Sequence, residues 1–136
     1  MMSDTEASFL KLELQLQFLE AAMADTAFVV SHLVKDLHCS FEAGDQCVEL
    51  QAAEHRLRTL LHQIRACAQQ EIETKDQVRE GQRLYRELLR EFETATRDFT
   101  DRAAAIAASL PPEEQADVQT HLDVLRSFRE DFPALN

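Results

Sequence analysis

The sequence predicts an all-α protein: an elongated coiled-coil or helical-bundle subunit with two main helices and a short C-terminal helix. The 136 residues include only 2 Gly and 3 Pro, and residues that favour long helices dominate. Apolar residues also recur in alternating steps of three and four, which places them on one helix face. Hydrophobic residues make up 45% and charged residues 29%, as in folded chains. The length indicates a single domain over residues 1–136.

The first helix is expected over about residues 4–37, starting at a capping box formed by Ser3 and Glu6. Its apolar seam comprises Phe9, Leu12, Leu16, Leu19, Met23, Thr26, Val30, Leu33 and Leu37. A second apolar set widens this surface and comprises Leu10, Leu14, Ala21, Phe28 and Val34. Such a broad apolar arc favours packing against two or more neighbouring helices. The pattern breaks over residues 38–45, where Asp45 is a candidate N-cap.

The second helix is expected to run without interruption over about residues 46–109 and to organise the fold. The first part of its seam comprises Leu50, Ala53, Leu57, Leu60, Ile64 and Cys67. The later part comprises Val78, Gly81, Tyr85, Leu88, Phe92, Ala95, Phe99, Arg102, Ile106 and Ser109. Glu71 and Thr74 fall between them and are interpreted as a polar layer that either fixes the register or is locally loosened. A helix of ~60 residues would be ~90 Å long, so we expect it to project and to be covered by helices of other chains.

A third helix is expected over about residues 112–131. Leu110 and Pro111 each precede a proline and therefore leave the α region. Pro112 can then start the helix, with Glu113 and Glu114 near its positive end. Its amphipathic stripe comprises Val118, Leu122, Leu125, Phe128 and Phe132. Pro133 is expected to stop the helix.

The composition limits which classes of partner this chain can bind directly. The formal net charge is -11 and the pI about 4.8, which disfavours nucleic acid, anionic membranes and the acidic microtubule as direct partners of this chain. The odd count of 3 Cys favours a reduced, intracellular setting. The N-terminus lacks the features of a secretory signal, and no apolar run reaches the length of a membrane span. We expect the charged faces to be solvated and to form pairs.

Neither catalysis nor the binding of a cofactor or metal is expected from the sequence. The two glycines stand alone, so neither a nucleophile loop nor a phosphate loop is apparent, and the chain is interpreted as non-enzymatic and without a cofactor. One four-residue zinc set is conceivable, although its spacing matches no common zinc module; it comprises His38, Cys39, Cys47 and His55. We therefore expect no metal. His55 and His62 share one helix face and are interpreted as a solvent or interface stripe.

The order of segments resembles a known family. The first helix is similar to that of the subunit 2 family of the spindle and kinetochore-associated (Ska) complex, over KLELQLQFLEAAMADTAFVVSHLVKDL. The residues that carry the likeness are Lys11 to Leu14, Phe18, Ala21 or Ala22, Asp25 and Phe28-Val29. The stretch LRTLLHQIRACAQQEIETK resembles the early part of that family's long second helix. LPPEEQ, with the short helix and C-terminal Phe and Pro that follow it, resembles its tail.

The resemblance implies a scaffold subunit that bundles with two other coiled-coil subunits. Such trimers pair into an elongated dimer at the outer kinetochore, which holds chromosomes on spindle microtubules during mitosis and cell division. The implied location is the cytoplasm and cytoskeleton, at the spindle and kinetochore. Microtubule binding belongs chiefly to another subunit, so this chain would reach microtubules only indirectly.

The expected partner interface consists of the large apolar seam residues. They are Phe9, Leu12, Leu16, Leu19, Met23, Val30, Leu33, Leu37, Leu50, Leu57, Leu60, Ile64, Val78, Tyr85, Leu88, Phe92, Phe99 and Ile106. Two alternatives stay open: a subunit of another small coiled-coil complex that positions vesicles or lysosomes, and an amphipathic helix bundle on a lipid surface. The lipid alternative would favour Lys and Arg beside a broad apolar face, which the acidic ends of this chain do not supply.

Overall fold

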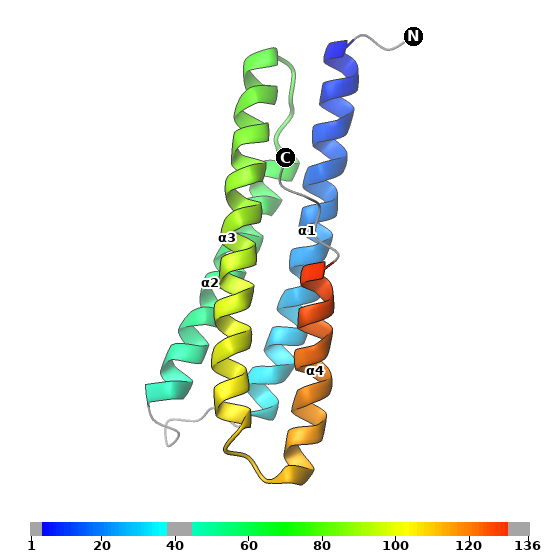
Figure 1. Cartoon of the computed structure of the whole chain (residues 1–136). Coiled ribbons are helices and arrows are strands. Elements are labelled where there is room, and N and C mark those ends of the chain that lie inside the picture. Colours follow the sequence, from blue (N-terminus) through cyan, green and yellow to red (C-terminus); the bar gives the residue numbers. More distant parts are fainter. Residues whose placement is uncertain (1–3, 38–44, 131–136) are drawn as a thin grey trace.

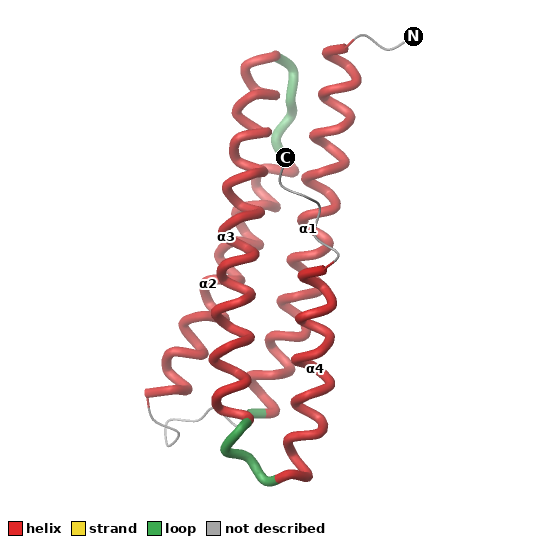
Figure 2. Tube along the Cα trace, viewed as in Figure 1, coloured by secondary structure: helices red, strands yellow, loops and turns green. Residues whose placement is uncertain are grey.

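The computed structural model describes residues 4–37 and 45–130, and these form four helices (Figures 1 and 2). The helices are α1 (Asp4–Asp36), α2 (Asp45–Gln69), α3 (Lys75–Ala107) and α4 (Pro112–Glu130). The all-α class is therefore confirmed. Consecutive helices run in opposite directions, so the chain passes down, up, down and up along a common axis (Figure 1).

The uninterrupted helix over residues 46–109 is wrong. α2 ends at Gln69 and α3 begins at Lys75, and the turn between them lets α3 run back along α2. With 25 and 33 residues, the two pieces are about 38 and 50 Å long, so no helix of the expected ~90 Å projects from the fold. The elongated subunit with two main helices is replaced by a bundle of four.

The break has a local cause at Thr74. This residue has extended backbone angles, φ -122 and ψ 158, and caps α3. Its hydroxyl accepts from the Gln77 backbone N–H at 3.2 Å, and the Gln77 side chain accepts from the Thr74 N–H at 3.0 Å. The reciprocal pair satisfies two backbone donors that a helix start leaves free. Thr74 and Glu71 therefore lie in a turn and do not form a buried polar layer, and both are exposed.

The other boundaries agree with expectation to within two residues. α1 starts at Asp4 and Leu37 follows its last turn. Asp45 is the first residue of α2, and Ala107 the last of α3. Pro112 begins α4 with Glu113 and Glu114 in the first turn, as predicted. Three sets of expectations lie outside the described residues: the Ser3 cap, the loop over 38–44 with His38 and Cys39, and the segment 131–136 with Phe132 and Pro133.

The central pair of the bundle is α1 and α3. Both helices contact α2 on one side and α4 on the other, whereas α2 and α4 make no contact within the described residues. With 19 residues, α4 is about 28 Å long and covers only part of the ~50 Å of α1. It lies along the C-terminal half of α1 (Figure 1). The outer face of α1 is therefore left partly uncovered.

The core consists of the predicted seams. All the large apolar residues expected at a partner interface are buried except Phe9, which is partly buried against the same core. Phe92 and Phe99 of α3 are the bulkiest of the fully buried side chains. The seams were therefore predicted correctly as buried faces. Their cover was not, because helices of the same chain provide it.

Candidate interaction surface

The partner interface expected from the sequence is closed in this fold. Leu57 and Ile64 of α2 face the same core as Leu88 and Phe92 of α3, and each is at most 5% exposed. A side chain that is buried within its own chain offers no surface to a second protein. A candidate binding surface therefore has to lie among the apolar side chains that the bundle leaves in solvent.

Four of the five exposed large hydrophobic residues in the described chain lie on α1. They are Leu10 at 43% exposure, Leu14 at 57%, Phe18 at 50% and Phe28 at 67%. We call these four residues the α1 stripe. Leu10, Leu14 and Phe18 follow one another at four-residue spacing. Phe28 lies on the same helix face as Leu10, five turns further along the helix. Single exposed apolar residues are ordinary, but an aligned series on one helix marks a docking face.

The sequence had indicated most of the α1 stripe. The second apolar set of the first helix contained Leu10, Leu14, Ala21, Phe28 and Val34. All of these are exposed except Val34, which is partly buried. Phe18 was missed as a surface residue, because it entered only through the family resemblance. Its signal was its spacing, since it lies four residues after Leu14 and three before Ala21 on one helical face.

Polar contacts hold α1 against its neighbours on either side of this surface. Toward α2, Arg58 donates to the Ser31 hydroxyl at 3.3 Å, and Arg65 lies 3.4 Å from Glu20. Toward α4, the rings of His32 and His121 are nearly parallel, with centroids 6.2 Å apart. These contacts are partly exposed and each contributes little stability, but they orient the outer face of α1 away from the core.

One end of the α1 stripe borders α4 through a series of aromatic rings. Phe28 contacts the His32 ring edge-on, with centroids 4.6 Å apart. The His121 Nδ1 atom lies 3.3 Å from the Asp36 carboxylate, without the alignment of a hydrogen bond. Phe28, His32 and His121 thus form a short ladder of rings from α1 to α4. The N-terminal part of α1 extends past the end of α4 (Figure 1).

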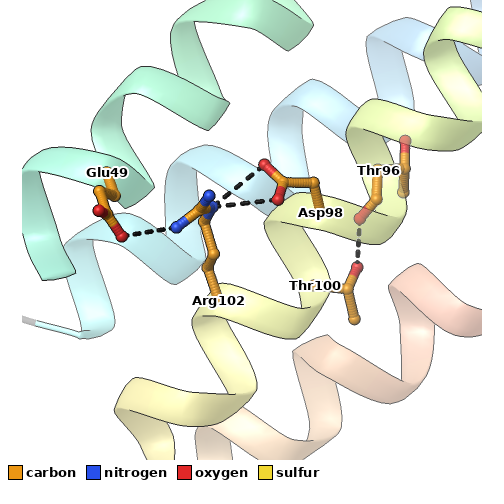
Figure 3. A network of polar contacts seen from close by, with 5 residues as sticks. All are labelled: Glu49, Thr96, Asp98, Thr100 and Arg102. Carbon is orange, nitrogen blue, oxygen red and sulfur yellow. Dashed lines mark hydrogen bonds and ion pairs between the residues drawn. The ribbon is translucent and has the colours of Figure 1, made fainter.

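Arg102 was predicted on the seam, and the structure shows how a charged residue occupies that position (Figure 3). Its Nε donates to both Asp98 oxygens at 3.1 Å, and its Nη1 donates to Glu49 of α2 at 2.6 Å. The hydrogen bond with Asp98 raises the pKa of Arg102 above its ordinary value. Nearby, Thr100 donates to the backbone carbonyl of Thr96 at 2.7 Å, so its buried hydroxyl is satisfied within α3. Arg102 therefore joins α3 to α2 at the edge of the core.

Most charged side chains of α2 and α3 are solvated, as expected, whereas Glu54 is buried and pairs with Arg58. Arg83 pairs with Glu80 and with Glu87 along one exposed face of α3. A hydrogen bond from Arg83 lowers the pKa of Glu80. His55 and His62 are both exposed on α2. Among the described residues, no three His, Cys, Asp or Glu side chains are grouped so as to hold a metal ion.

Two further observations complete the description of the surface. No helix within residues 4–37 and 45–130 has both the length and the apolar character needed to cross a membrane. Comparison of the chain with protein-family models, with curated protein sequences and with solved structures finds no match in any of the three.

Proposed function

We propose that this chain is a non-catalytic scaffold protein that works by binding other helical proteins through the α1 stripe. The observation that carries the proposal is the alignment of Leu10, Leu14, Phe18 and Phe28 on a face that the bundle leaves exposed. Amphipathic helices recognise one another through apolar residues at this spacing. A stripe of this kind supplies affinity by removing apolar surface from water on association.

The setting proposed for this scaffold is a Ska-like complex at the outer kinetochore. Its support is the likeness of the first helix, the second-helix segment and the C-terminal stretch described above. The charge of -11 is consistent with a subunit that reaches microtubules only through its partners. In this proposal, the two partner subunits are held by the outer face of α1, because the seams are occupied by the chain's own core.

A subunit of a different small coiled-coil complex would use the same surface, and the identity of the co-purifying chains separates the two settings. A lipid surface is the weaker alternative. α1 carries six acidic and two basic residues, whereas a helix that lies on anionic lipid has basic residues beside its apolar face. A flotation assay with anionic vesicles tests this alternative directly.

The decisive experiment compares two charge insertions in the full chain. Phe18→Glu places a charge within the stripe, whereas Val48→Glu places the same charge at another exposed apolar residue, 66% exposed on α2. The tagged variants are purified from dividing cells and the co-purifying chains are identified. We expect wild type and Val48→Glu to recover the same partner chains, and Phe18→Glu to lose them. Equal recovery by all three proteins would contradict the proposed surface, and partners without any link to the spindle would contradict the proposed setting.

A further inference from the structure

The outer face of α1 carries a complete second seam. Ten positions alternate in steps of three and four along the helix, and every one of them is exposed. They are Asp4, Ala7, Lys11, Leu14, Phe18, Ala21, Asp25, Phe28, His32 and Lys35. Alternating steps of three and four form the contact face of a two-stranded coiled coil. Leu14, Phe18 and Phe28 of the α1 stripe are thus the large apolar residues of a longer face whose spacing suits one more helix, and Leu10 lies beside it.

The charged residues of this second seam alternate in sign from one end of the helix to the other. Asp4 stands at one end and Lys35 at the other, and Lys11 and Asp25 lie between each end and the centre. Phe18 and Ala21 flank the midpoint. In a partner helix of the same sequence and opposite direction, Lys35 would therefore face Asp4, and Asp25 would lie one layer from Lys11.

We propose that the occupant of this face is the α1 helix of a second copy of the chain, packed antiparallel about a twofold axis between Leu19 and Glu20. The inference rests on the proposed function: in the chain on its own, a second copy covers the surface that the partner subunits would use, and they would have to displace it. The facing pairs are Asp4 with Lys35, Ala7 with His32, Lys11 with Phe28, Leu14 with Asp25, and Phe18 with Ala21. Because the contact is isologous, each pair occurs twice.

Electrostatics selects the antiparallel direction. In a parallel, in-register pair, Lys11 would face Lys11 and Asp25 would face Asp25, and such like-charge contacts weaken coiled coils. In the antiparallel pair, Lys11 of one copy lies one layer from Asp25 of the other, so the ammonium group can reach the carboxylate. The same reversal brings Lys35 of each copy to Asp4 of the other.

Steric fit supports the same register. Phe18 faces Ala21, so a large side chain meets a small one at the centre of the contact, on both sides of the axis. The aliphatic stem of Lys11 can cover the Phe28 ring of the other copy, which leaves the charged end at the rim. At 1.5 Å per residue, the stripe from Leu10 to Phe28 extends about 27 Å, long enough for several layers of contact.

The test is the association state of the full chain, measured by sedimentation equilibrium over a concentration series. We expect a reversible dimer for wild type and for Val48→Glu, and a monomer for Phe18→Glu. Circular dichroism and urea unfolding of each variant show that the fold is retained, which is expected because Phe18 and Val48 are both exposed. A wild type that remains monomeric at every concentration overturns the inference, and so does a dimer that Phe18→Glu leaves intact.

Charge exchange tests the direction of packing. Lys11→Glu should weaken the dimer roughly tenfold, because it creates two like-charge contacts. Adding Asp25→Lys to the same chain should restore the affinity, since the antiparallel contacts again have opposite signs. In a parallel pair, positions 11 and 25 carry like charges in wild type and in both variants, so neither this weakening nor this rescue is expected, and absence of either overturns the inference.

The two proposals fail separately. If wild type is monomeric but Phe18→Glu still loses partner chains from cells, the α1 stripe binds a different protein and only the second-copy inference is wrong. If the dimer forms as described but partner recovery is unaffected by Phe18→Glu, the stripe serves self-association and the proposed scaffold surface is wrong.

Discussion

Leu12 of α1 and Gly81 of α3 are in close contact: a Cβ built at Gly81 would lie 2.6 Å from the Leu12 Cδ2 atom. Leu12 is fully buried, so its side chain has little room to move. Glycine in the interior of a helix lowers helix stability by about 1 kcal/mol relative to alanine. At Gly81 this loss of helix stability is offset, because the absence of a side chain lets the two central helices, α1 and α3, approach each other closely.

This contact predicts a strong coupling between the two positions. Gly81→Ala should destabilise the wild-type protein by about 1–2 kcal/mol, because the added methyl group displaces Leu12 from its packing. In a Leu12→Ala background the same change should be neutral or stabilising, because the methyl group then enters the space that the leucine leaves. Urea unfolding of the four proteins measures the coupling free energy. A zero coupling would show that the helices do not approach as described.

The second prediction concerns the turn between α2 and α3. Thr74→Ala removes the hydroxyl that caps α3 and should lower the free energy of unfolding by about 1 kcal/mol. Thr59→Ala is a matched control, because the Thr59 hydroxyl is also exposed but bonds to its own helix at His55. Its expected effect is a few tenths of a kcal/mol at most. Both are measured by urea unfolding, and equal effects would argue against the cap.

The third prediction concerns whether the core is intramolecular. In the purified chain alone, Phe92→Ala should cost about 3–5 kcal/mol, because the ring is 1% exposed. Arg90→Ala, on the exposed face of the same helix, should change stability by less than about 0.5 kcal/mol. Thermal and urea unfolding provide the measurement. If the lone chain showed no cooperative transition, or equal losses for both variants, the seams would need cover from another chain.

The fourth prediction concerns the thiol of Cys67. Burial raises the pKa of Cys67 above that of an ordinary cysteine, because desolvation disfavours the thiolate. In a variant with Cys39 and Cys47 changed to Ser, the pH midpoint of alkylation by iodoacetamide should be higher in the folded protein than in urea. The folded state prefers the neutral thiol, so its contribution to stability is present below the ordinary thiol pKa and is lost as the pH rises through the raised value. Coincident or reversed midpoints would contradict this environment.

Helix positions and buried faces could be predicted from the sequence, because heptad spacing fixes which side of a helix is apolar. Leu16, Ile64 and Phe99 were assigned to buried faces and are buried. The spacing does not say which helix provides the cover. Cover by the same chain needs only a reversal of direction, and the reversal at residues 70–74 was not predicted.

The signal for that reversal was present but was outweighed. Thr74 and Gln77 have the spacing of a capping box immediately before the apolar residue Val78. The seam continues through the same residues without a change of phase, so the pattern was interpreted as one helix with a polar layer. Local capping chemistry decided the outcome. Glu71 and Thr74 occupy two consecutive positions of the seam, and both are polar. A continuous helix would bury no apolar side chain at these positions, so a break there loses no such burial.

The candidate surface could be predicted only in part. The second apolar set indicated that the first helix has more apolar surface than one neighbour covers. The sequence alone does not define which part α4 covers, because this depends on where α4 ends along α1. Phe28 borders α4 through His32 and His121, whereas the N-terminal part of α1 extends past the end of α4 (Figure 1).

The unbroken phase of the seam across residues 70–74 has a consequence for how this chain can exchange partners. A straightened α2 and α3 would present the same apolar face along their joint length, so the seams can serve either an internal core or an external helix. They cannot serve both at once, because each side chain is buried only once. Any protein that takes hold of these seams must compete with α1 and α4 for them. The free energy that such a protein gains by binding the seams therefore has to exceed the free energy of unfolding of the isolated bundle.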